Sequence, residues 1–308
     1  MRFHSWISRQ YPWLPEKIRS YIDLVRPFTL LAPLLGCLAF GLFALIVDTG
    51  QDLDWYALKI LVYGAVTLAL VNAGSNIFNQ ANEVEIDQVN KPDRPIPAGR
   101  VDEDEALVLA IILYGFAMAR ALFMPPYFGM GVMWLAFITM LYSHPVIYLK
   151  KRYVVNNLTM AIARGYLGPW TAWCLFGDPW APVVHGACLI LAVWTFGGIC
   201  TKDMPDLEGD RKHGIRTFPV VIGVQRTRHL VTASMIAPFV MVPIMIQGSV
   251  FVSSMIWFLL LSPLGVGIVV AIYGRDPASM VENRVSWVLM YILFMAMLLS
   301  FPVIYLLA

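Results

Sequence analysis

The chain has 308 residues, of which 59% are hydrophobic and only 14% are charged, and its formal net charge is +2. About a quarter of the residues in an ordinary soluble domain are charged, so this composition excludes that class and favours membrane-spanning helices. The small net charge gives no bulk attraction for nucleic acid, and we expect no nucleic-acid partner. The four cysteines lie in apolar stretches without zinc-ligand spacing and are interpreted as buried small hydrophobic residues.

Residues 1–27 are predicted to form an interfacial segment that lies on the membrane surface. Tryptophan and aliphatic side chains alternate in this segment with Arg9, Lys17 and Arg19. Such a mixture is typical of segments that contact both the lipid tails and the headgroups. The alternative interpretation is a disordered tail.

Nine apolar runs follow, and their lengths are close to the roughly 20 residues that a helix needs to cross a bilayer. They occupy residues 28–47, 57–79, 105–124, 127–148, 155–176, 181–201, 229–248, 251–273 and 285–307. We therefore expect an all-α integral membrane protein in which residues 28–308 form a single domain of nine transmembrane helices. Membrane lipids are expected partners of such a surface.

The basic residues predict how this domain is oriented in the membrane. Most of the 22 Lys and Arg residues fall in the N-terminal segment and in the loops after the second, fourth, sixth and eighth runs. The intervening loops are short and nearly uncharged. Because basic loops stay on the cytoplasmic side, we expect the N-terminus and these loops to be cytoplasmic and the C-terminus to lie across the membrane.

The second run ends in a polar stripe. Asn79, Glu83 and Asp87 are spaced four residues apart and would share one face of a continuous helix. Asn72 and Asn76 would continue this face deeper into the membrane. Carboxylates at this depth are costly and normally line a polar cavity with partners.

The sixth run ends in a second acidic stripe. Asp203, Asp206 and Asp210 would share one face if the helix continues through Pro205. Carboxylates are hard oxygen ligands, which suit Mg²⁺. The alternative for each stripe is a set of solvated helix-end charges, but two matching stripes, each followed by basic residues, favour a magnesium site.

Basic residues accompany both stripes. Lys91 and Arg94 follow the first stripe, and Arg211 follows the second. Lys and Arg side chains can neutralise the diphosphate oxygens that Mg²⁺ leaves uncovered. They would thereby stabilise diphosphate as the leaving group of an allylic carbon–oxygen cleavage. The alternative is that the positive-inside rule alone places these cations.

These segments resemble the motifs of the UbiA superfamily of intramembrane prenyltransferases. The family's first motif, Asn-Asp-x-x-Asp-x-x-x-Asp followed by a basic Pro/Gly loop, is similar to residues 79–99. The second motif matches residues 202–219 at every fixed position. The resemblance covers essentially the whole chain and implies a nine-helix bundle around a central cavity under a cytoplasmic cap.

The resemblance also implies roles for individual residues. The implied Mg²⁺ ligands are Asn79, Glu83, Asp87, Asp203, Asp206 and Asp210. The implied diphosphate-binding residues are Asn79, Lys91, Arg94, Lys150 and Arg211. The residues implied to be catalytic are Asp87, Asp203, Asp206 and Lys150. Gln80 and Glu83 depart from the family pattern, because Gln80 supplies no negative charge and Glu83 carries its charge on a longer side chain.

The expected activity is magnesium-dependent transfer of a prenyl group from an isoprenoid diphosphate to an aromatic, quinone-precursor or lipid acceptor. A terpene cyclase, which would use the same ionisation without an acceptor, is the alternative. A transporter is a third reading, disfavoured because the carboxylates cluster at the predicted cytoplasmic ends of helices and not near the bilayer midplane.

Five further residues are candidates for supporting roles. Arg164 lies inside the fifth run, where it must pair or face the cavity. The others could act as a base, orient an acceptor or stabilise a cation, although each also has a plain structural reading; they are Tyr142, His144, Tyr148 and Tyr166.

Overall fold

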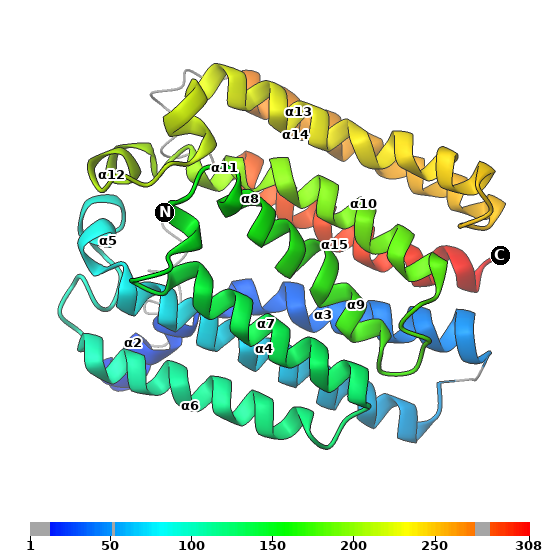
Figure 1. Ribbon diagram of the computed structural model, residues 1–308, viewed down its shortest axis with the longest axis horizontal. Coiled ribbons are helices and arrows are strands. Elements are labelled where there is room, and N and C mark those ends of the chain that lie inside the picture. Colours follow the sequence, from blue (N-terminus) through cyan, green and yellow to red (C-terminus); the bar gives the residue numbers. More distant parts are fainter. Residues whose placement is uncertain (1–12, 51–52, 275–283) are drawn as a thin grey trace.

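The computed structural model describes residues 13–50, 53–274 and 284–308, and these residues form helices joined by turns and loops, without a strand among them (Figure 1). The predicted interfacial segment is therefore described only from residue 13. The described part contains α2 (Glu16–Val25), an amphipathic helix that is followed by Arg26 in the left-handed conformation. The part of the prediction before residue 13 lies outside the described residues.

Seven helical segments of the described residues are long and apolar enough to cross a membrane. They are Pro27–Thr49, Trp55–Asn82, Pro126–Ser143, Pro182–Asp203, Phe218–Gln247, Ser253–Tyr273 and Ser286–Leu306. Each corresponds to one of the nine predicted runs, so the chain is a multi-pass integral membrane protein. The two other runs are also helical, in α6 (Glu103–Ala121) and in the consecutive helices α8 (Val155–Met160), η3 (Ala161–Leu167) and α9 (Gly168–Trp173).

The remaining helices have the following bounds. The first half of the chain adds α3 (Pro27–Ala44), η1 (Leu45–Thr49), α4 (Trp55–Asn82), α5 (Val84–Asn90), α7 (Pro126–Ser143) and η2 (Leu149–Lys151). The second half adds α10 (Pro182–Gly198), α11 (Cys200–Asp203), α12 (Leu207–Lys212), α13 (Phe218–Gln247), η4 (Ser253–Leu261), α14 (Ser262–Tyr273) and α15 (Arg284–Leu306).

The long helices run roughly side by side as a bundle (Figure 1). α3 packs against α4 and α15, and α10 packs against α13 and η3. The pair of α13 and α14 lies along one edge of the view, and α6 lies along the other. The short helices α5 and α12 contact each other at one end, and the C-terminus lies at the opposite end.

Small residues allow these helices to approach closely. A side chain at Gly165 would overlap the backbone of Ala192 on α10, and one at Gly197 would overlap Ser234 on α13. Small residues are what membrane helices need at contacts, since lipid offers no hydrophobic force to drive helices together. Both contacts tie α10 into the centre of the bundle.

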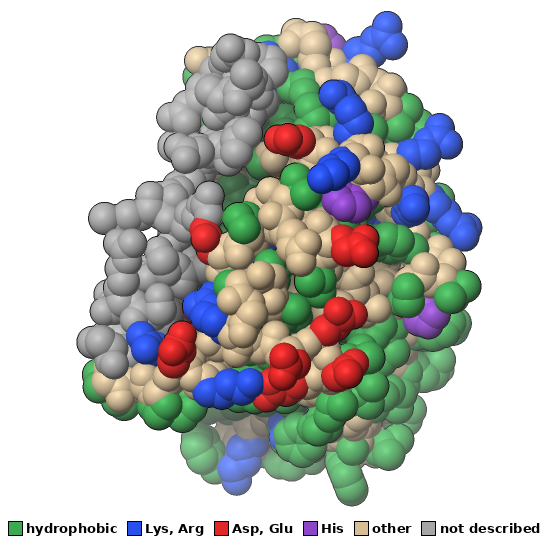
Figure 2. All heavy atoms as spheres, turned by 90° about the vertical axis from the view of Figure 1, so that its left-hand side faces the viewer, with side chains coloured by type: hydrophobic (Ala, Val, Ile, Leu, Met, Phe, Trp, Pro, Cys, Tyr) green, Lys and Arg blue, Asp and Glu red, His purple; other side chains and the backbone are tan. Residues whose placement is uncertain are grey.

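Charge is unevenly distributed over the surface. Large apolar side chains on the outer helices are exposed, among them Val108, Ile112 and Phe116 on α6. The end of the bundle that carries α5 and α12 shows a concentration of acidic and basic side chains (Figure 2). An apolar belt beside a charged end is the surface expected of a protein that crosses a bilayer.

Candidate active site

The first acidic segment is not one continuous helix, so that prediction is wrong at Glu83. α4 ends at Asn82, Glu83 has φ −121° and ψ 26°, and α5 begins at Val84. The Nδ2 group of Asn79 nevertheless donates a hydrogen bond to Oε1 of Glu83, at 2.5 Å. The break turns α5 away from the axis of α4 while Asn79 and Glu83 remain together.

The second acidic segment is also interrupted, because the helix does not continue through Pro205. α11 ends at Asp203, a turn follows, and α12 begins at Leu207. Proline has no backbone N–H to donate, and its ring opposes the preceding helical turn. As a result Asp203, Asp206 and Asp210 do not share one helical face, and the turn brings Asp206 toward the first segment.

The two segments are joined where α5 meets α12. Nζ of Lys91 lies 2.6 Å and 2.5 Å from the two carboxylate oxygens of Asp206. Asn90 donates through Nδ2 to the carbonyl oxygen of Asp206 at 3.3 Å and accepts from the backbone N–H of Gly209 at 3.0 Å. Residues that follow two helices far apart in the sequence are thus joined at this end of the bundle, in a charged cluster that we term the cap.

Two more ion pairs belong to the cap, and both are buried. Arg94 pairs with Asp87, and Lys150 on η2 pairs with Glu83. The exposed fractions are 2% for Glu83, 2% for Asp87 and 6% for Lys150. Burying charges is unfavourable unless they are paired, so each carboxylate holds one of the cations predicted to bind phosphate.

Asp203 and Asp210 lack a cation within ion-pair distance among the described residues. Oδ2 of Asp203 accepts from Nδ2 of Asn156 at 3.1 Å, and Asn156 in turn accepts from the hydroxyl of Tyr142 at 2.7 Å. Oδ2 of Asp210 accepts from Oγ1 of Thr217 at 3.4 Å. Its other oxygen, Oδ1, is buried without a hydrogen-bond partner in the described part of the chain.

Neighbouring charges give the carboxylates of the cap different proton affinities. Burial raises the pKa of Asp210 to about 7, against the opposing effect of Lys150. Burial also acts to raise the pKa of Asp206, but the ammonium groups of Lys91 and Lys202 outweigh it and the pKa of Asp206 is lowered. Burial opposes the charge on Lys150, yet the Glu83 carboxylate keeps the pKa of Lys150 well above its ordinary value.

The donor set suits a magnesium ion that arrives with its substrate. Within the described ranges, no three His, Cys, Asp or Glu side chains come close enough to hold a metal by themselves. The buried and unpartnered Oδ1 of Asp210 is nonetheless an acceptor without a donor, and the surrounding acids are hard oxygen ligands. Mg²⁺ typically takes part of its coordination from substrate phosphates and water, so an incomplete protein cage is the expected arrangement.

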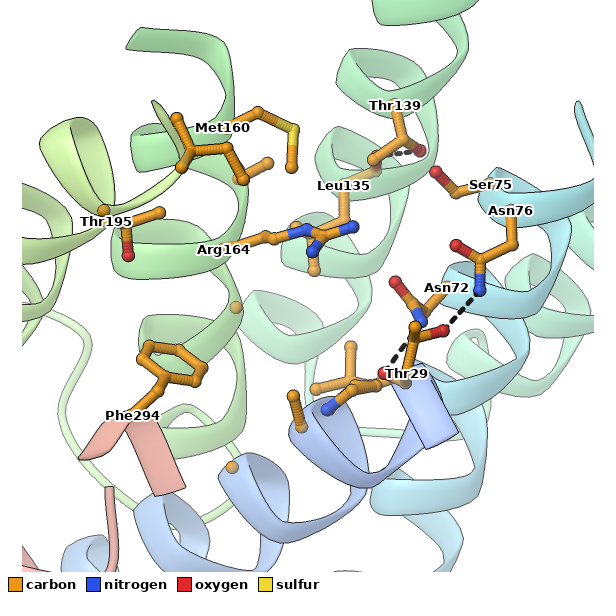
Figure 3. A pocket seen from close by; sticks show the side chains of 18 of the residues that line it. Thr29, Asn72, Ser75, Asn76, Leu135, Thr139, Met160, Arg164, Thr195 and Phe294 are labelled. Carbon is orange, nitrogen blue, oxygen red and sulfur yellow. Dashed lines mark hydrogen bonds between the residues drawn. The ribbon is translucent and has the colours of Figure 1, made fainter. Parts of the chain in front are cut away.

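A cavity of about 230 Å³ lies among the helices beside this cluster. Asn79 and Tyr142, which contact the acidic cluster, also line the cavity. Three cations line it as well, and no carboxylate lies within ion-pair distance of them among the described residues; they are Arg26, Arg164 and Lys202. In Figure 3 the side chain of Arg164 extends from its helix across the cavity toward Thr29 and Asn72.

Local structure explains why Arg164 faces the cavity. It lies in η3, a π-helical segment, and short π-helical segments are frequent at functional sites. Gly165 lets η3 approach α10 closely from the other side. The sequence predicted that Arg164 either pairs with a carboxylate or faces the cavity. In the structure its side chain lines the cavity.

Several candidates are not brought to the cluster. The side chain of Arg211 on α12 is exposed, so its role in phosphate binding stays a prediction. Nδ1 of His144 accepts from the backbone N–H of Val146 at 3.3 Å, which ties it to its own turn. The hydroxyl of Tyr166 lies 2.5 Å from Nδ1 of His185, outside the lining of the cavity.

Tyr148 remains close to the cluster. Its backbone has φ 41°, in the left-handed region, immediately before η2. Its hydroxyl is buried without a hydrogen-bond partner among the described atoms. Burial and the nearby Glu83 carboxylate raise the pKa of Tyr148, so its hydroxyl is held in the protonated form.

Three residues of the site were not given a role from the sequence. Asn156 positions Asp203, and Arg26 and Lys202 line the cavity. A signal exists for Lys202, a cation directly before Asp203 at the end of an apolar helix, where charges are rarely without function. Nothing in the spacing of Asn156 marks it, because its contact with Asp203 joins residues 47 positions apart.

Solved and curated proteins are similar to this chain. A UbiA homolog from Archaeoglobus fulgidus bound to DMAPP and Mg²⁺ has the same fold, with a TM-score of 0.70 at 17% identity over 94% of this chain and 99% of that chain. Digeranylgeranylglyceryl phosphate synthase of Methanospirillum hungatei is 28% identical over 72% of this chain and 75% of its own length. Probable homogentisate phytyltransferase 2 of Oryza sativa is 29% identical over 91% of this chain and 76% of its own length.

The family model named UbiA prenyltransferase family matches residues 37–298, which include both acidic segments and every helix from α4 to α14. Relatives with this fold are named for the transfer of prenyl groups. The chain therefore belongs to the UbiA prenyltransferase family and is a membrane enzyme that transfers prenyl groups.

Proposed function

We propose that the protein transfers the prenyl group of a magnesium-bound isoprenoid diphosphate to an acceptor that carries an anionic group. The observation that carries this proposal is the contrast between two neighbouring sets of charge. At the cap, three carboxylates (Glu83, Asp87 and Asp206) are paired with cations, whereas three cations of the cavity have no carboxylate partner among the described residues; these are Arg26, Arg164 and Lys202.

The paired charges of the cap are suited to an exchange of partners. A diphosphate offers anionic oxygens to Lys91, Arg94 and Lys150, and such charge-assisted hydrogen bonds are strong. The carboxylates that these cations release become free to meet the positive charge of Mg²⁺. The exchange leaves no buried charge without a partner, which would otherwise be costly.

Six residues would hold the metal: Asn79, Glu83, Asp87, Asp203, Asp206 and Asp210. When bound, Mg²⁺ would neutralise charge that develops on the diphosphate. The cation partners of the cap would stabilise the same charge from the protein side. A solved protein of the same fold, the UbiA homolog from Archaeoglobus fulgidus, holds Mg²⁺ and DMAPP, which supports a magnesium-dependent reaction here.

The transfer is a substitution at the first carbon of the prenyl chain. The carbon–oxygen bond breaks and its electron pair leaves with the diphosphate, held by Lys91, Arg94 and Lys150. A nucleophilic oxygen or carbon of the acceptor forms the new bond, and its proton passes to water or to the released diphosphate. Asp87, Asp203 and Asp206 would act by holding the Mg²⁺, which would in turn bind the leaving diphosphate.

The unpaired cations support an anionic acceptor. An unpaired guanidinium in an enclosed cavity is unfavourable and gains strongly from a phosphate or carboxylate. The names of the relatives point to two such compounds, a glyceryl phosphate lipid and homogentisate, and each carries one of these groups. Arg164, which extends into the cavity, is the residue we assign to this anion (Figure 3).

A terpene cyclase is the second candidate, and the aromatic wall of the cavity favours it. The rings of Trp194 and Phe294 stack with centroids 5.3 Å apart, and both line the cavity. Aromatic faces attract carbocations. A guanidinium such as Arg164 would repel a carbocation folded in the same space, and for this reason we prefer intermolecular transfer.

The test compares acceptors of matched shape with and without charge. Homogentisate and its methyl ester, or a glyceryl phosphate lipid and the corresponding alcohol, are given to the wild type and to Arg164→Gln. We expect Arg164→Gln to raise KM for the charged acceptor about 10- to 100-fold, the value of one charge-assisted hydrogen bond, and to leave the neutral compound unaffected.

Two control variants sharpen this comparison. Arg164→Lys keeps the charge and should retain part of the affinity, whereas Arg152→Gln removes an exposed cation and should change nothing. Equal KM values for charged and neutral acceptors in the wild type would contradict the anionic-acceptor proposal.

A further inference from the structure

Gln80 occupies the position at which the family motif has its first Asp, yet its side chain points away from the metal site. Nε2 of Gln80 donates to the backbone carbonyl of Leu24 at 2.7 Å and to that of Asn76 at 3.0 Å. Both partners are carbonyl oxygens, which only accept, so the amide orientation is fixed by its surroundings. The side chain is almost fully buried, with 1% exposed.

Two other amides on α4 make the same kind of contact. Asn76 donates through Nδ2 to the carbonyl of Val25 at 3.0 Å and to Oγ1 of Thr29 at 2.8 Å. Asn72 donates through Nδ2 to the carbonyl of Thr29 at 3.2 Å (Figure 3). Asn72, Asn76 and Gln80 are spaced four residues apart and so form a row on one face of α4, which we term the amide ladder.

The amide ladder is hydrogen-bonded to the junction between α2 and α3. The last carbonyls of a helix have no partner within it, and leaving them unpaired at membrane depth is costly. The ladder supplies donors to Leu24 and Val25, the last residues of α2, and to Thr29 in the first turn of α3. These bonds fix the junction in place with respect to α4.

Arg26 lies between the residues to which the amide ladder is hydrogen-bonded, namely Leu24 and Val25 on one side and Thr29 on the other. Its backbone has φ 60° and ψ 67°, in the left-handed region that residues with a side chain rarely adopt. Its side chain lines the cavity, and its Nε is buried without a hydrogen-bond partner among the described atoms. A strained backbone persists only where surrounding contacts hold it, and the ladder provides such contacts on both sides.

We propose that the amide ladder holds Arg26 in the cavity to bind an anionic group of a substrate, and that Gln80 is a positioning residue and not a metal ligand. An Asp at this position would be shorter and, when ionised, would have no N–H to give to Leu24. Its negative charge would face a carbonyl oxygen. The departure from the family motif at Gln80 thus has a function of its own.

This inference rests on the proposed function, because the anion could be the diphosphate or the acid group of the acceptor. Gln80→Glu tests it, since Glu preserves length and shape but removes the N–H donors when ionised. Asn82→Asp is the matched control, because Nδ2 of Asn82 donates only to the carbonyl of Phe78 in its own helix. Arg26→Ala gives the effect of losing the guanidinium itself.

Steady-state kinetics separate positioning from metal binding. We expect Gln80→Glu to raise KM for one substrate about 10-fold or more, as a lost charge-assisted contact does, while the Mg²⁺ concentration for half-maximal rate stays unchanged. A raised KM for the acceptor places Arg26 on its acid group, and a raised KM for the prenyl diphosphate places it on phosphate. Unchanged KM values for both, or a markedly altered Mg²⁺ requirement, would overturn the proposal.

A double variant tests whether Gln80 acts through Arg26. If it does, Gln80→Glu adds nothing to the KM of Arg26→Ala, because the positioned group is already absent. If the KM increase of the double variant equals the product of the two single increases, the two residues act independently and the positioning role is refuted. Asn72→Asp, at the other end of the amide ladder, carries the same test if Gln80→Glu is not recovered folded.

Hydrogen exchange provides a readout that needs no turnover. We expect the backbone amides of residues 24–30 to exchange faster in Gln80→Glu than in the wild type or Asn82→Asp. Unchanged exchange would refute the amide ladder even if the enzyme transfers prenyl groups as proposed. The other outcome is faster exchange of these amides in Gln80→Glu together with a wild-type enzyme that uses no anionic acceptor. That outcome would contradict the proposed function but would still establish that the amide ladder holds the junction between α2 and α3.

Discussion

At the scale of single residues, the site is defined by which charges have partners. Glu83, Asp87 and Asp206 each hold a cation, whereas one oxygen of Asp210 has no partner among the described atoms. The second acidic segment therefore contains two carboxylates whose pKa values are shifted in opposite directions. Burial raises the pKa of Asp210 to about 7, while Lys91, together with other ammonium groups, outweighs burial and lowers that of Asp206.

The proton on Asp210 predicts a pH dependence of magnesium binding. Mg²⁺ binds the carboxylate form, which dominates above the raised pKa of about 7 and is lost as the pH falls through it. We expect the Mg²⁺ concentration for half-maximal rate to rise roughly tenfold between pH 8 and pH 6, the change in the ionised fraction of a group that titrates near 7.

Asp210→Asn is the control for this pH dependence. The variant retains the titration of the diphosphate itself but has no carboxyl group at position 210, so its requirement for Mg²⁺ should be higher and much less dependent on pH. A wild-type profile with the same slope as Asp210→Asn would rule out a titrating Asp210.

The residue scale also shows where sequence reasoning succeeds. The acidic and basic residues of the two motifs could be named because charge is expensive beside apolar helices, and the structure brings Asp87, Asp206 and Lys91 to one end of the bundle. Their pairing could not be predicted, since Lys91 and Asp206 are 115 positions apart. Gln80 looked like a weakened ligand because a motif carries no information on the direction of a side chain.

At the scale of elements, two helix breaks shape the site. Helical spacing predicted continuous stripes, but α4 ends before Glu83 and α11 ends before Pro205. A proline signals its break in the sequence, whereas Glu83 has no such signal because its conformation follows from the ion pair with Lys150 and the contact of α5 with α12. Tertiary contacts therefore outweigh helix propensity at Glu83, whereas at Pro205 the low helix propensity of proline itself ends the helix.

The contact of α5 with α12 makes Gly209 sensitive to substitution. A methyl group at Gly209 would overlap the side-chain amide of Asn90, which bonds to both Asp206 and Gly209. We expect Gly209→Ala to cost about 1–3 kcal/mol of local packing and to raise KM for the prenyl diphosphate. The measurement is a KM determination alongside thermal unfolding in detergent.

Glu208→Ala is the neighbouring control, since Glu208 is exposed on the same short helix. It should leave KM and the unfolding midpoint unchanged. Wild-type kinetics in Gly209→Ala would show that the join between α5 and α12 has no part in binding the diphosphate.

At the scale of the whole molecule, the positions of the apolar helices could be predicted from the sequence, whereas the count of nine spans stays a prediction. Seven helical segments meet the length and hydropathy of a membrane span, and the two other predicted runs are helical as well. A central cavity was expected from the family resemblance and from the carboxylates at membrane depth, which normally line a polar cavity. Its three cations could not be foreseen as a set, since Arg26, Arg164 and Lys202 come from helices far apart in the sequence.

The orientation in the membrane is a prediction of the same scale. All four native cysteines are buried, so single exposed cysteines can report the side on which they lie. In a bacterial host, Ala98→Cys near the acidic cluster should react with a membrane-impermeant maleimide only after the membrane is opened, and Ala308→Cys should react in intact spheroplasts. The reverse pattern would contradict a cytoplasmic cap.

The central claim is that the enzyme ionises a prenyl diphosphate for transfer to an anionic acceptor. The most direct measurement is product formation by purified protein from geranylgeranyl diphosphate and Mg²⁺, with and without homogentisate or a glyceryl phosphate lipid. We predict a prenylated acceptor only when one of these is present, and a fall of about 100-fold or more in Asp206→Asn. A cyclic hydrocarbon or alcohol formed from the diphosphate alone, and lost in Asp206→Asn, would contradict the account.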